Sequence, residues 1–175
     1  MLITLFTDAS YCSRSRVAAY AAWAKADGRT VRHSSVLKQP VQTSSLAETM
    51  ALVNGIHLAI AALRPPAASK IIAQTDCLGA IQALSGMLRR AEVIRQYAAV
   101  VAAYRDKVAA ADVVVEFRHV GGHKGTVTPR NAVNTWCDGE CRRLMRAARA
   151  ALLGPQSQDL PAPEGRAPAF PACTG

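Results

Sequence analysis

Four of the twelve acidic residues in this sequence lie where a carboxylate is hard to accommodate. Asp8 and Asp76 each follow a short apolar run that is typical of a buried strand, and Glu48 lies on an apolar helical segment. Asp138 lies inside a helical segment near the end of the chain. A carboxylate at the end of a buried strand destabilises the fold unless a positive charge neutralises it. Because strands of an α/β sheet can end at one edge, we expect Asp8 and Asp76 to lie close together.

A cluster of three or four carboxylates predicts a bound divalent cation. Like charges at close range raise one another's pKa, so the carboxylates cannot all stay ionised without a cation. Oxygen ligands alone select Mg²⁺ or Mn²⁺ over Zn²⁺. Taken singly, Asp8 and Asp76 also fit turn positions, and Glu48 fits the dipole of a helix N-terminus. Asp138 can simply pair with Arg142, four residues later on the same helix.

The segments between these acids predict a mixed α/β domain. The first helix begins at a capping Ser44 or Ser45 and stops before Pro65. The expected strands span residues 2–7, 17–25, 30–37, 70–75 and 113–120, and the expected helices span residues 44–64, 78–88, 91–110 and 132–153. Three strands in a meander, followed by alternating helix and strand in the order βββαβααβα, predict a mixed five-stranded sheet flanked by helices.

Composition limits the class of protein. With 175 residues, 50% of them hydrophobic and 19% charged, the chain can form one domain with a sizeable core. There is no run of 18 apolar residues and no signal-peptide pattern, so we expect a soluble, cytoplasmic monomer without a membrane partner. Five cysteines without CxxC spacing indicate reduced thiols. Residues 154–175 hold five of the nine prolines, so we expect a domain over 1–153 and a disordered Pro-rich tail.

The charge balance points to a polyanionic partner. The chain carries +9, and the tail contains one base and two acids, so residues 1–153 carry +10. A folded domain this basic usually binds nucleic acid, although such a charge also occurs in proteins that bind none.

Other features have simpler interpretations. Cys137 and Cys141 share a helix face without another zinc ligand at suitable spacing, so we expect them to pack, and we expect His119 to pack or to face solvent.

The ordered set of acids resembles the ribonuclease H family, specifically its type I cellular and retroviral enzymes. Asp8 lies in TDAS, Glu48 in SSLAETMAL and Asp76 in AQTDCLGA, while Asp138 follows VGGH. No single motif is specific, but the ordered set covers residues 1–150. The resemblance implies a ribonuclease H-like α/β fold and hydrolysis of the RNA strand of RNA/DNA hybrids. It also implies that the four acids bind two Mg²⁺ ions, with Mn²⁺ as a substitute.

Two-metal chemistry explains why four carboxylates would be needed. Two ions roughly 4 Å apart can activate a water on one side of a phosphodiester and stabilise the leaving oxygen on the other. No covalent intermediate is required, which agrees with the lack of a convincing Ser-His-Asp or Cys-His set. In this scheme Asp8 and Asp76 form the shared centre of the site. Asp138 holds the ion on the nucleophile side and Glu48 the ion nearer the leaving group.

The resemblance also assigns roles around the acids. His123, in VGGHKGTV, matches a mobile family histidine that assists proton transfer or product departure. Asn134 matches an asparagine that contacts substrate. The loop after His123 is longer than in typical members and carries Lys124 and Arg130, which could contact phosphate or simply be solvated. Thr43 and Ser44 retain hydroxyl groups where the family binds a DNA phosphate.

The segment after the first strand departs from the family pattern. Family members usually have a glycine-containing loop there that senses 2′-hydroxyl groups, whereas TDASYCSRSRVAAY has no glycine and offers Arg14 and Arg16 instead. Two alternatives therefore stay open beside the hybrid-cleaving enzyme. One is a nuclease of the same superfamily that acts on DNA, as junction resolvases and exonucleases do, and the other is a catalytically silent nucleic-acid-binding module.

Overall fold

The computed structural model describes residues 1–121 and 129–154 of the chain. Within these residues the order of elements is the predicted βββαβααβα. The elements are β1 (Leu2–Cys12), β2 (Val17–Ala26), β3 (Arg29–Val36), α1 (Ser44–Leu63), β4 (Ser69–Thr75), α2 (Leu78–Leu84), α3 (Ala91–Ala111), β5 (Val113–His119) and α4 (Pro129–Leu153). The predicted mixed five-stranded α/β fold is confirmed.

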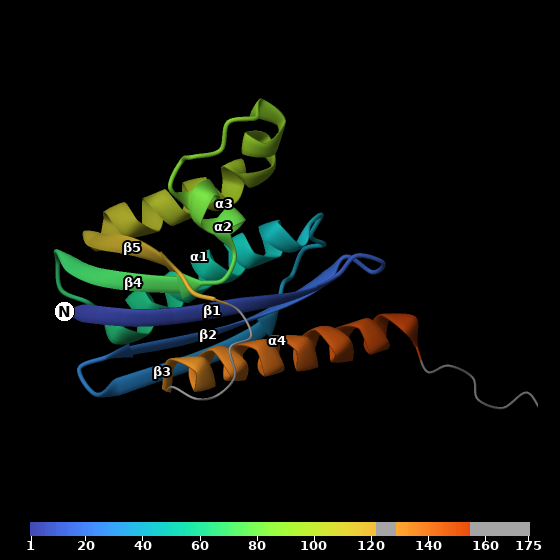
Figure 1. The fold of residues 1–175 in the computed structure, drawn as a ribbon, viewed down its shortest axis with the longest axis horizontal. Helices are drawn as coiled ribbons and strands as arrows, with labels where there is room; N and C mark the ends of the chain where they lie inside the picture. Colours follow the sequence, from blue (N-terminus) through green and yellow to red (C-terminus); the bar gives the residue numbers. More distant parts are fainter. Residues whose placement is uncertain (122–128, 155–175) are drawn as a thin grey trace, which may run out of the picture.

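β1 is the central strand of a sheet with the order β3-β2-β1-β4-β5 (Figure 1). It runs antiparallel to β2 and parallel to β4, and β5 continues the parallel half of the sheet. The pairing of β1 with β4 ends at Phe6 and Gln74, whereas its pairing with β2 continues to Cys12 and Val17. β1 therefore extends beyond the parallel half of the sheet, and Asp8 lies just past the point where β4 ends.

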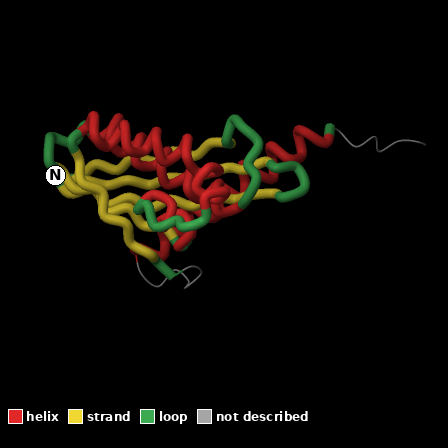
Figure 2. The backbone as a smooth tube through the Cα atoms, turned by 90° about the horizontal axis from the view of Figure 1, so that it is seen from above, coloured by secondary structure: helices red, strands yellow, loops and turns green. Residues whose placement is uncertain are grey.

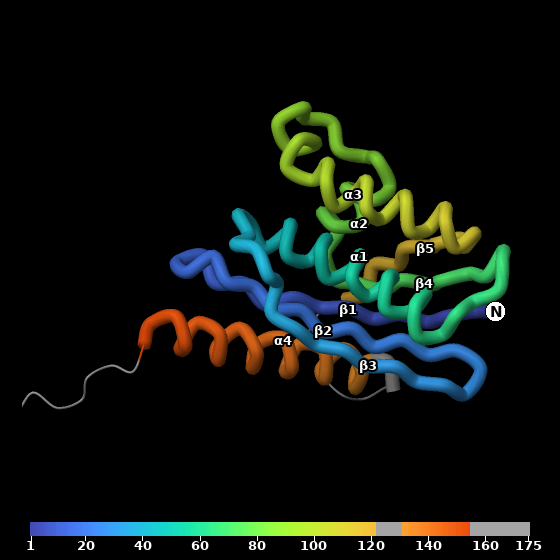
Figure 3. The backbone as a smooth tube through the Cα atoms, turned by 180° about the vertical axis from the view of Figure 1, so that it is seen from behind, coloured from blue at the N-terminus to red at the C-terminus, as the bar shows by residue number. Residues whose placement is uncertain are grey.

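The two faces of the sheet are covered by different helices. Leu5 packs in the cluster that contains residues of α1, while its neighbour Phe6 packs with Cys137 and Cys141 of α4. Successive side chains of a strand point to opposite faces, so α1 and α4 lie on opposite sides of the sheet. Seen from behind, α3 lies toward the β5 edge and α4 toward the β3 edge (Figure 3). The N-terminus and the last turns of α4 lie at opposite ends of the molecule (Figure 2).

α1 approaches the sheet closely because it carries a glycine at the contact. A Cβ on Gly55 would lie 2.5 Å from Thr7 Cγ2 and 3.2 Å from Leu5 Cδ1. By length and composition, α1 is the one helix among the described residues that could cross a membrane. Ten of its residues are buried, and the helix packs against β1 and β2. Its apolar composition therefore has an explanation within the fold.

Three predicted details differ from the structure. Asp8 does not end the first strand, because residues 8–12 continue β1 by pairing with β2. The cap of α1 is Thr43 rather than Ser44 or Ser45, since the Thr43 Oγ1 accepts a hydrogen bond of 3.1 Å from the Leu46 amide. The second helix ends at Leu84 instead of continuing to residue 88, and Gly86 follows it with a φ of 72°.

Candidate active site

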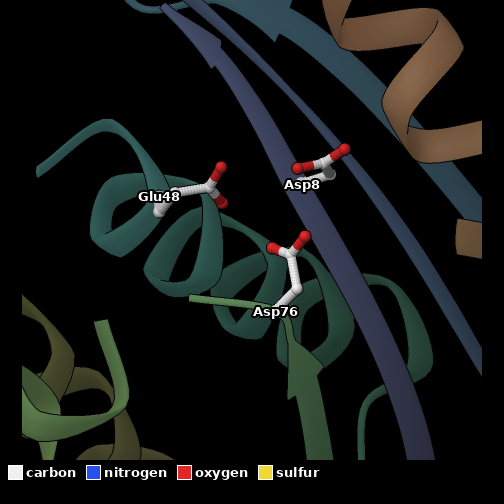
Figure 4. A group of neighbouring side chains, drawn as sticks. All are labelled: Asp8, Glu48 and Asp76. Atoms are coloured by element: carbon white, nitrogen blue, oxygen red, sulfur yellow. The ribbon is translucent and has the colours of Figure 1, made fainter. Parts of the chain in front are cut away.

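Three carboxylates from three different elements converge at the carboxyl end of β4. Asp8 comes from β1, Glu48 from the second turn of α1 and Asp76 from the residue after β4 (Figure 4). One carboxylate oxygen of each lies within 4.8 Å of the others. The parallel register explains why the two aspartates are close. Phe6 of β1 pairs with Gln74 of β4, and Asp8 and Asp76 each come two residues later in the sequence. The structure thus brings together three of the four acids chosen from the sequence.

One backbone amide links two of these acids. The Ala9 N–H donates to Asp8 Oδ1 at 2.9 Å and to Glu48 Oε1 at 3.3 Å. This single donor does not offset the effect of burial and of like charge. Desolvation, together with the negative charges of Asp76 and Asp138, raises the pKa of Asp8 from 3.8 to about 7. Desolvation and the charges of Asp8 and Asp76 raise the pKa of Glu48 from 4.5 to about 9.

The donor set fits a divalent metal ion. Glu48 Oε2 is buried and has no hydrogen-bond partner, so it is an acceptor that the described residues leave unsatisfied. The group of three offers only carboxylate oxygens, which are the ligands that Mg²⁺ and Mn²⁺ prefer. A cation bound between these carboxylates would satisfy Glu48 Oε2 and would allow all three groups to ionise.

Asp138 lies near this cluster, but the group of three does not include it. Its charge is one of the causes that raise the pKa of Asp8, which shows that α4 brings it close. Asp138 Oδ1 instead forms an ion pair of 2.9 Å with Arg142 Nη2, the i,i+4 partner that the sequence offered as a simpler explanation. Both explanations of Asp138 therefore have support: it is near the cluster, and it already has a counterion.

Polar and aromatic contacts hold α4 against β3. Ser34 Oγ donates to Glu140 Oε1 at 2.9 Å, and the Arg32 guanidinium lies 5.4 Å from the centroid of the Trp136 ring. Hydrogen bonds from Arg143 and Ser34 lower the pKa of Glu140 to about 2, so this contact carries a charge at neutral pH. On the inner side of α4, Cys137 and Cys141 are fully buried, as expected for packing residues. These contacts fix the part of α4 that carries Asp138.

Two contributions to the site were not chosen from the sequence. The first is the Ala9 amide, because no side-chain pattern marks a backbone donor. The second is His119, whose Nε2 donates to the Asp76 carbonyl oxygen at 3.0 Å while the ring remains exposed. The expectation that His119 faces solvent holds, but the ring also fixes the chain at Asp76. The sequence did hold a signal for this contact. His119 is the last residue of β5 and pairs with Thr75, the residue before Asp76.

The residues expected to bind substrate are not gathered at the carboxylates. Arg14 and Arg16 are exposed in the turn between β1 and β2, and Arg16 has a φ of 56°. Four residues of extended strand separate Asp8 from Cys12, where the turn begins, and they span about 14 Å. Thr43 and Ser44 are exposed at the start of α1, roughly one turn before Glu48. Arg14 and Arg16 could contact a substrate only if it extends along the surface away from the cluster, whereas Thr43 and Ser44 are close to Glu48 along the helix.

The remaining candidates belong to the segment that leads into α4. Asn134 is partly buried on α4, one turn before Asp138. Arg130 lies in the first turn of α4, but its side chain is not described. His123 and Lys124 lie outside the described residues. Their predicted roles in proton transfer and phosphate contact stay predictions.

Comparison with known proteins identifies the family. The family model described as RNase H matches residues 2–145, which is most of the chain and includes all four acids. The chain belongs to the RNase H family. It is a ribonuclease H enzyme by this membership, which agrees with the resemblance stated from the order of the acids. No match among curated protein sequences was found.

Solved structures of RNase H enzymes share the fold. The RNase H1 of the archaeon Halobacterium salinarum aligns with a TM-score of 0.59 at 16% identity, covering 84% of this chain and 99% of that one. The N-terminal RNase H domain of a Mycobacterium tuberculosis protein gives 0.58 at 16% identity, with 86% and 98% covered. LC11-RNase H1, solved in complex with an RNA/DNA hybrid, gives 0.54 at 14%, with 85% and 99% covered. At these identities the likeness concerns the fold.

Proposed function

We propose that this RNase H hydrolyses the RNA strand of RNA/DNA hybrids as an endonuclease. The observation that carries the proposal is the convergence of Asp8, Glu48 and Asp76 at the end of the parallel half of the sheet, in a chain of this family. The complex of the structurally similar LC11-RNase H1 with an RNA/DNA hybrid supports the choice of substrate. The charge of +9 supports binding to a polyanion.

We further propose that the site works with two Mg²⁺ ions, which Mn²⁺ can replace. Asp8 and Asp76 would hold both ions, Glu48 the one nearer the leaving group and Asp138 the one on the nucleophile side. When bound, the ions would supply an activated water and charge stabilisation at the leaving oxygen. The raised pKa values of Asp8 and Glu48 support this proposal, because the ionised site needs positive charge.

The residues of the chain have distinct tasks in this scheme. The Ala9 amide holds the Asp8 and Glu48 carboxylates in one orientation. His119 fixes the backbone at Asp76. Asp138 must exchange its ion pair with Arg142 for a metal ion, or share its two oxygens between them. His123 would then assist proton transfer or product departure.

Substrate binding would rest mainly on charge and hydroxyl groups. Arg14 and Arg16 would contact phosphates away from the cleavage site, because β1 spans about 14 Å beyond Asp8 before the turn that carries them. The other proposed contacts are Thr43, Ser44, Lys124, Arg130 and Asn134. Phosphate contacts of this kind position a substrate without reading its bases.

The proposal is tested by substrate choice. The full chain is incubated in Mg²⁺ with labelled RNA/DNA hybrid, double-stranded DNA, double-stranded RNA and a four-way DNA junction. We expect cleavage of the hybrid only, loss of activity in Asp76→Asn, and full activity in Asp106→Asn, whose exposed acid lies on α3. Equal activity of Asp76→Asn and the wild type would show that the cluster is not the active site.

A second candidate function is a nuclease that acts on DNA. The observation that favours it is the turn between β1 and β2, where residues 13–16 offer arginine side chains and no glycine. Sensing a 2′-hydroxyl group requires close approach of the protein, which long side chains at an exposed turn do not favour. Cleavage of the DNA substrates alone would support this function. Binding to all substrates without cleavage would instead indicate a silent binding module.

A further inference from the structure

α3 is a long helix that buries little of its surface. Of its 21 residues only Tyr97 is buried. Its N-terminal half and the connection from α2 stand away from the sheet (Figure 1 and Figure 3). This half nevertheless has an apolar stripe at helical spacing, formed by Ile94, Tyr97, Ala98, Val101 and Ala102. A helix face of this kind, without a full covering from its own chain, is a candidate for contact with another molecule.

The stripe forms one wall of a groove. Ala83 at the end of α2 and Gly86 and Leu88 of the α2–α3 connection form the other wall of a hollow of about 330 Å³. Leu88 also lines an adjoining hollow of about 490 Å³, together with Met87, Arg89 and Arg90. The two hollows are called the α2–α3 groove below. Ile94 is 45% exposed and Met87 is 64% exposed, so large apolar side chains at the groove are open to solvent.

Arginines line both hollows of the α2–α3 groove. Arg105 lines the first hollow, and its Nη2 lies 3.8 Å from the position of a Cβ on Gly86. Arg89 and Arg90 line the second hollow. None of the ion pairs between described side chains uses these three arginines. The acids on α3, Glu92 and Asp106, do not line either hollow.

We propose that the α2–α3 groove binds an acidic peptide segment of a partner protein, with a large apolar side chain of the peptide inserted between α2 and α3. The apolar walls would bury the anchor residue, and the arginines that line the two hollows would pair with acidic residues near it in the peptide. The volume of the first hollow is at the lower end of the range for ligand pockets, which suits a single side chain rather than a folded surface.

Two other occupants fit the α2–α3 groove less well. A second copy of this chain would bring a charge of +9 toward the arginines, which opposes self-association through this surface. A nucleic acid could pair its phosphates with the arginines, but its charged backbone would not match the apolar side chains of Leu88 and Ile94 that line the groove. An acidic peptide with an apolar anchor matches both the charge and the walls. Such a partner would recruit the enzyme without occupying the carboxylate cluster.

The test uses peptide selection on the full-length protein. Random dodecapeptides displayed on phage are selected against the wild type, and the affinity of the enriched peptides is then measured by fluorescence anisotropy. Ala98→Trp fills the first hollow, and Arg105→Glu reverses its charge; both residues are exposed, so the fold should persist. Lys107→Glu is the matched control, because Lys107 is an exposed base on the same helix that does not line the groove.

We expect enriched peptides that combine Asp or Glu with Leu, Ile or Phe. Their affinity should fall about tenfold or more in Arg105→Glu and in Ala98→Trp, and by less than about twofold in Lys107→Glu. Hybrid cleavage should be the same in all four proteins, which separates this inference from the proposed function. Three results would overturn the inference. They are no enrichment of peptides, enrichment of peptides without acidic residues, and peptide affinities that are the same in Arg105→Glu and Ala98→Trp as in the wild type. Weakened hybrid binding in those variants, or a wild-type dimer that Ala98→Trp dissociates, would assign the groove to nucleic acid or to self-association instead.

Discussion

Replacing Asp8 by asparagine should make the metal-free protein more stable while removing its activity. The pKa of Asp8 rises from 3.8 to about 7 in the fold, so the folded protein holds this proton more tightly than the unfolded chain does. The stabilisation by this proton is complete below pH 3.8 and is lost as the pH rises through 7. A difference of roughly 3 pKa units sets an upper limit of about 4 kcal/mol on the destabilisation by the ionised group.

The expected gain for Asp8→Asn is about half of that limit, since Asp8 is partly exposed and solvent screens part of the repulsion. About 2 kcal/mol at pH 8 corresponds to an increase in Tm of about 6 °C for a domain of this size. The assay is urea unfolding in EDTA at pH 5 and pH 8, with Asp106→Asn as the control. The gain should be largest at pH 8, where wild-type Asp8 is ionised, and small at pH 5.

Added Mg²⁺ separates this explanation from a general effect of the substitution. A cation bound by the cluster relieves the same repulsion, so Mg²⁺ at pH 8 should stabilise the wild type and have a smaller effect on Asp8→Asn. The reasoning is refuted if Asp8→Asn is no more stable than the wild type at pH 8 in EDTA. It is also refuted if Mg²⁺ raises the stability of both proteins equally.

Three further predictions concern packing, the ion pair of Asp138 and substrate binding. Gly55→Val should lower the free energy of unfolding by about 2 kcal/mol or more in urea titrations, because even a Cβ would lie 2.5 Å from Thr7 Cγ2; an unchanged midpoint would contradict the close contact. Arg142→Ala should lower the Mg²⁺ concentration for half-maximal cleavage by about twofold, since the pair is partly exposed and weak; a higher requirement would show that Arg142 assists metal binding. Binding of the hybrid should weaken steeply with added salt, and a flat salt dependence would exclude phosphate contacts as its main source.

The order and type of the elements could be predicted because local signals mark them. Pro65 limits the first helix, and the apolar runs before Asp8 and Asp76 have the length of strands. We expected these two aspartates to lie close together because strands of such a sheet can end at one edge; they do lie close, although β1 continues past Asp8, because the parallel register pairs Phe6 with Gln74. The extension of β1 to Cys12 could not be predicted, because its pairing with β2 is a nonlocal contact. The i,i+4 spacing of Asp138 and Arg142 predicted their ion pair. Only the structure shows that Asp138 forms this pair and also lies close to Asp8.

The difference in length between β1 and β4 explains why the site forms where it does. β4 ends at Thr75, while β1 continues beside β2. Beyond Phe6, β1 therefore has no partner strand on its β4 side, and a backbone donor there must find another acceptor. The Ala9 amide donates its hydrogen bonds to the carboxylates of Asp8 and Glu48 instead of to a neighbouring strand. A longer β4 would pair with this donor, so the early end of β4 is what leaves the Ala9 amide to the Asp8 and Glu48 carboxylates.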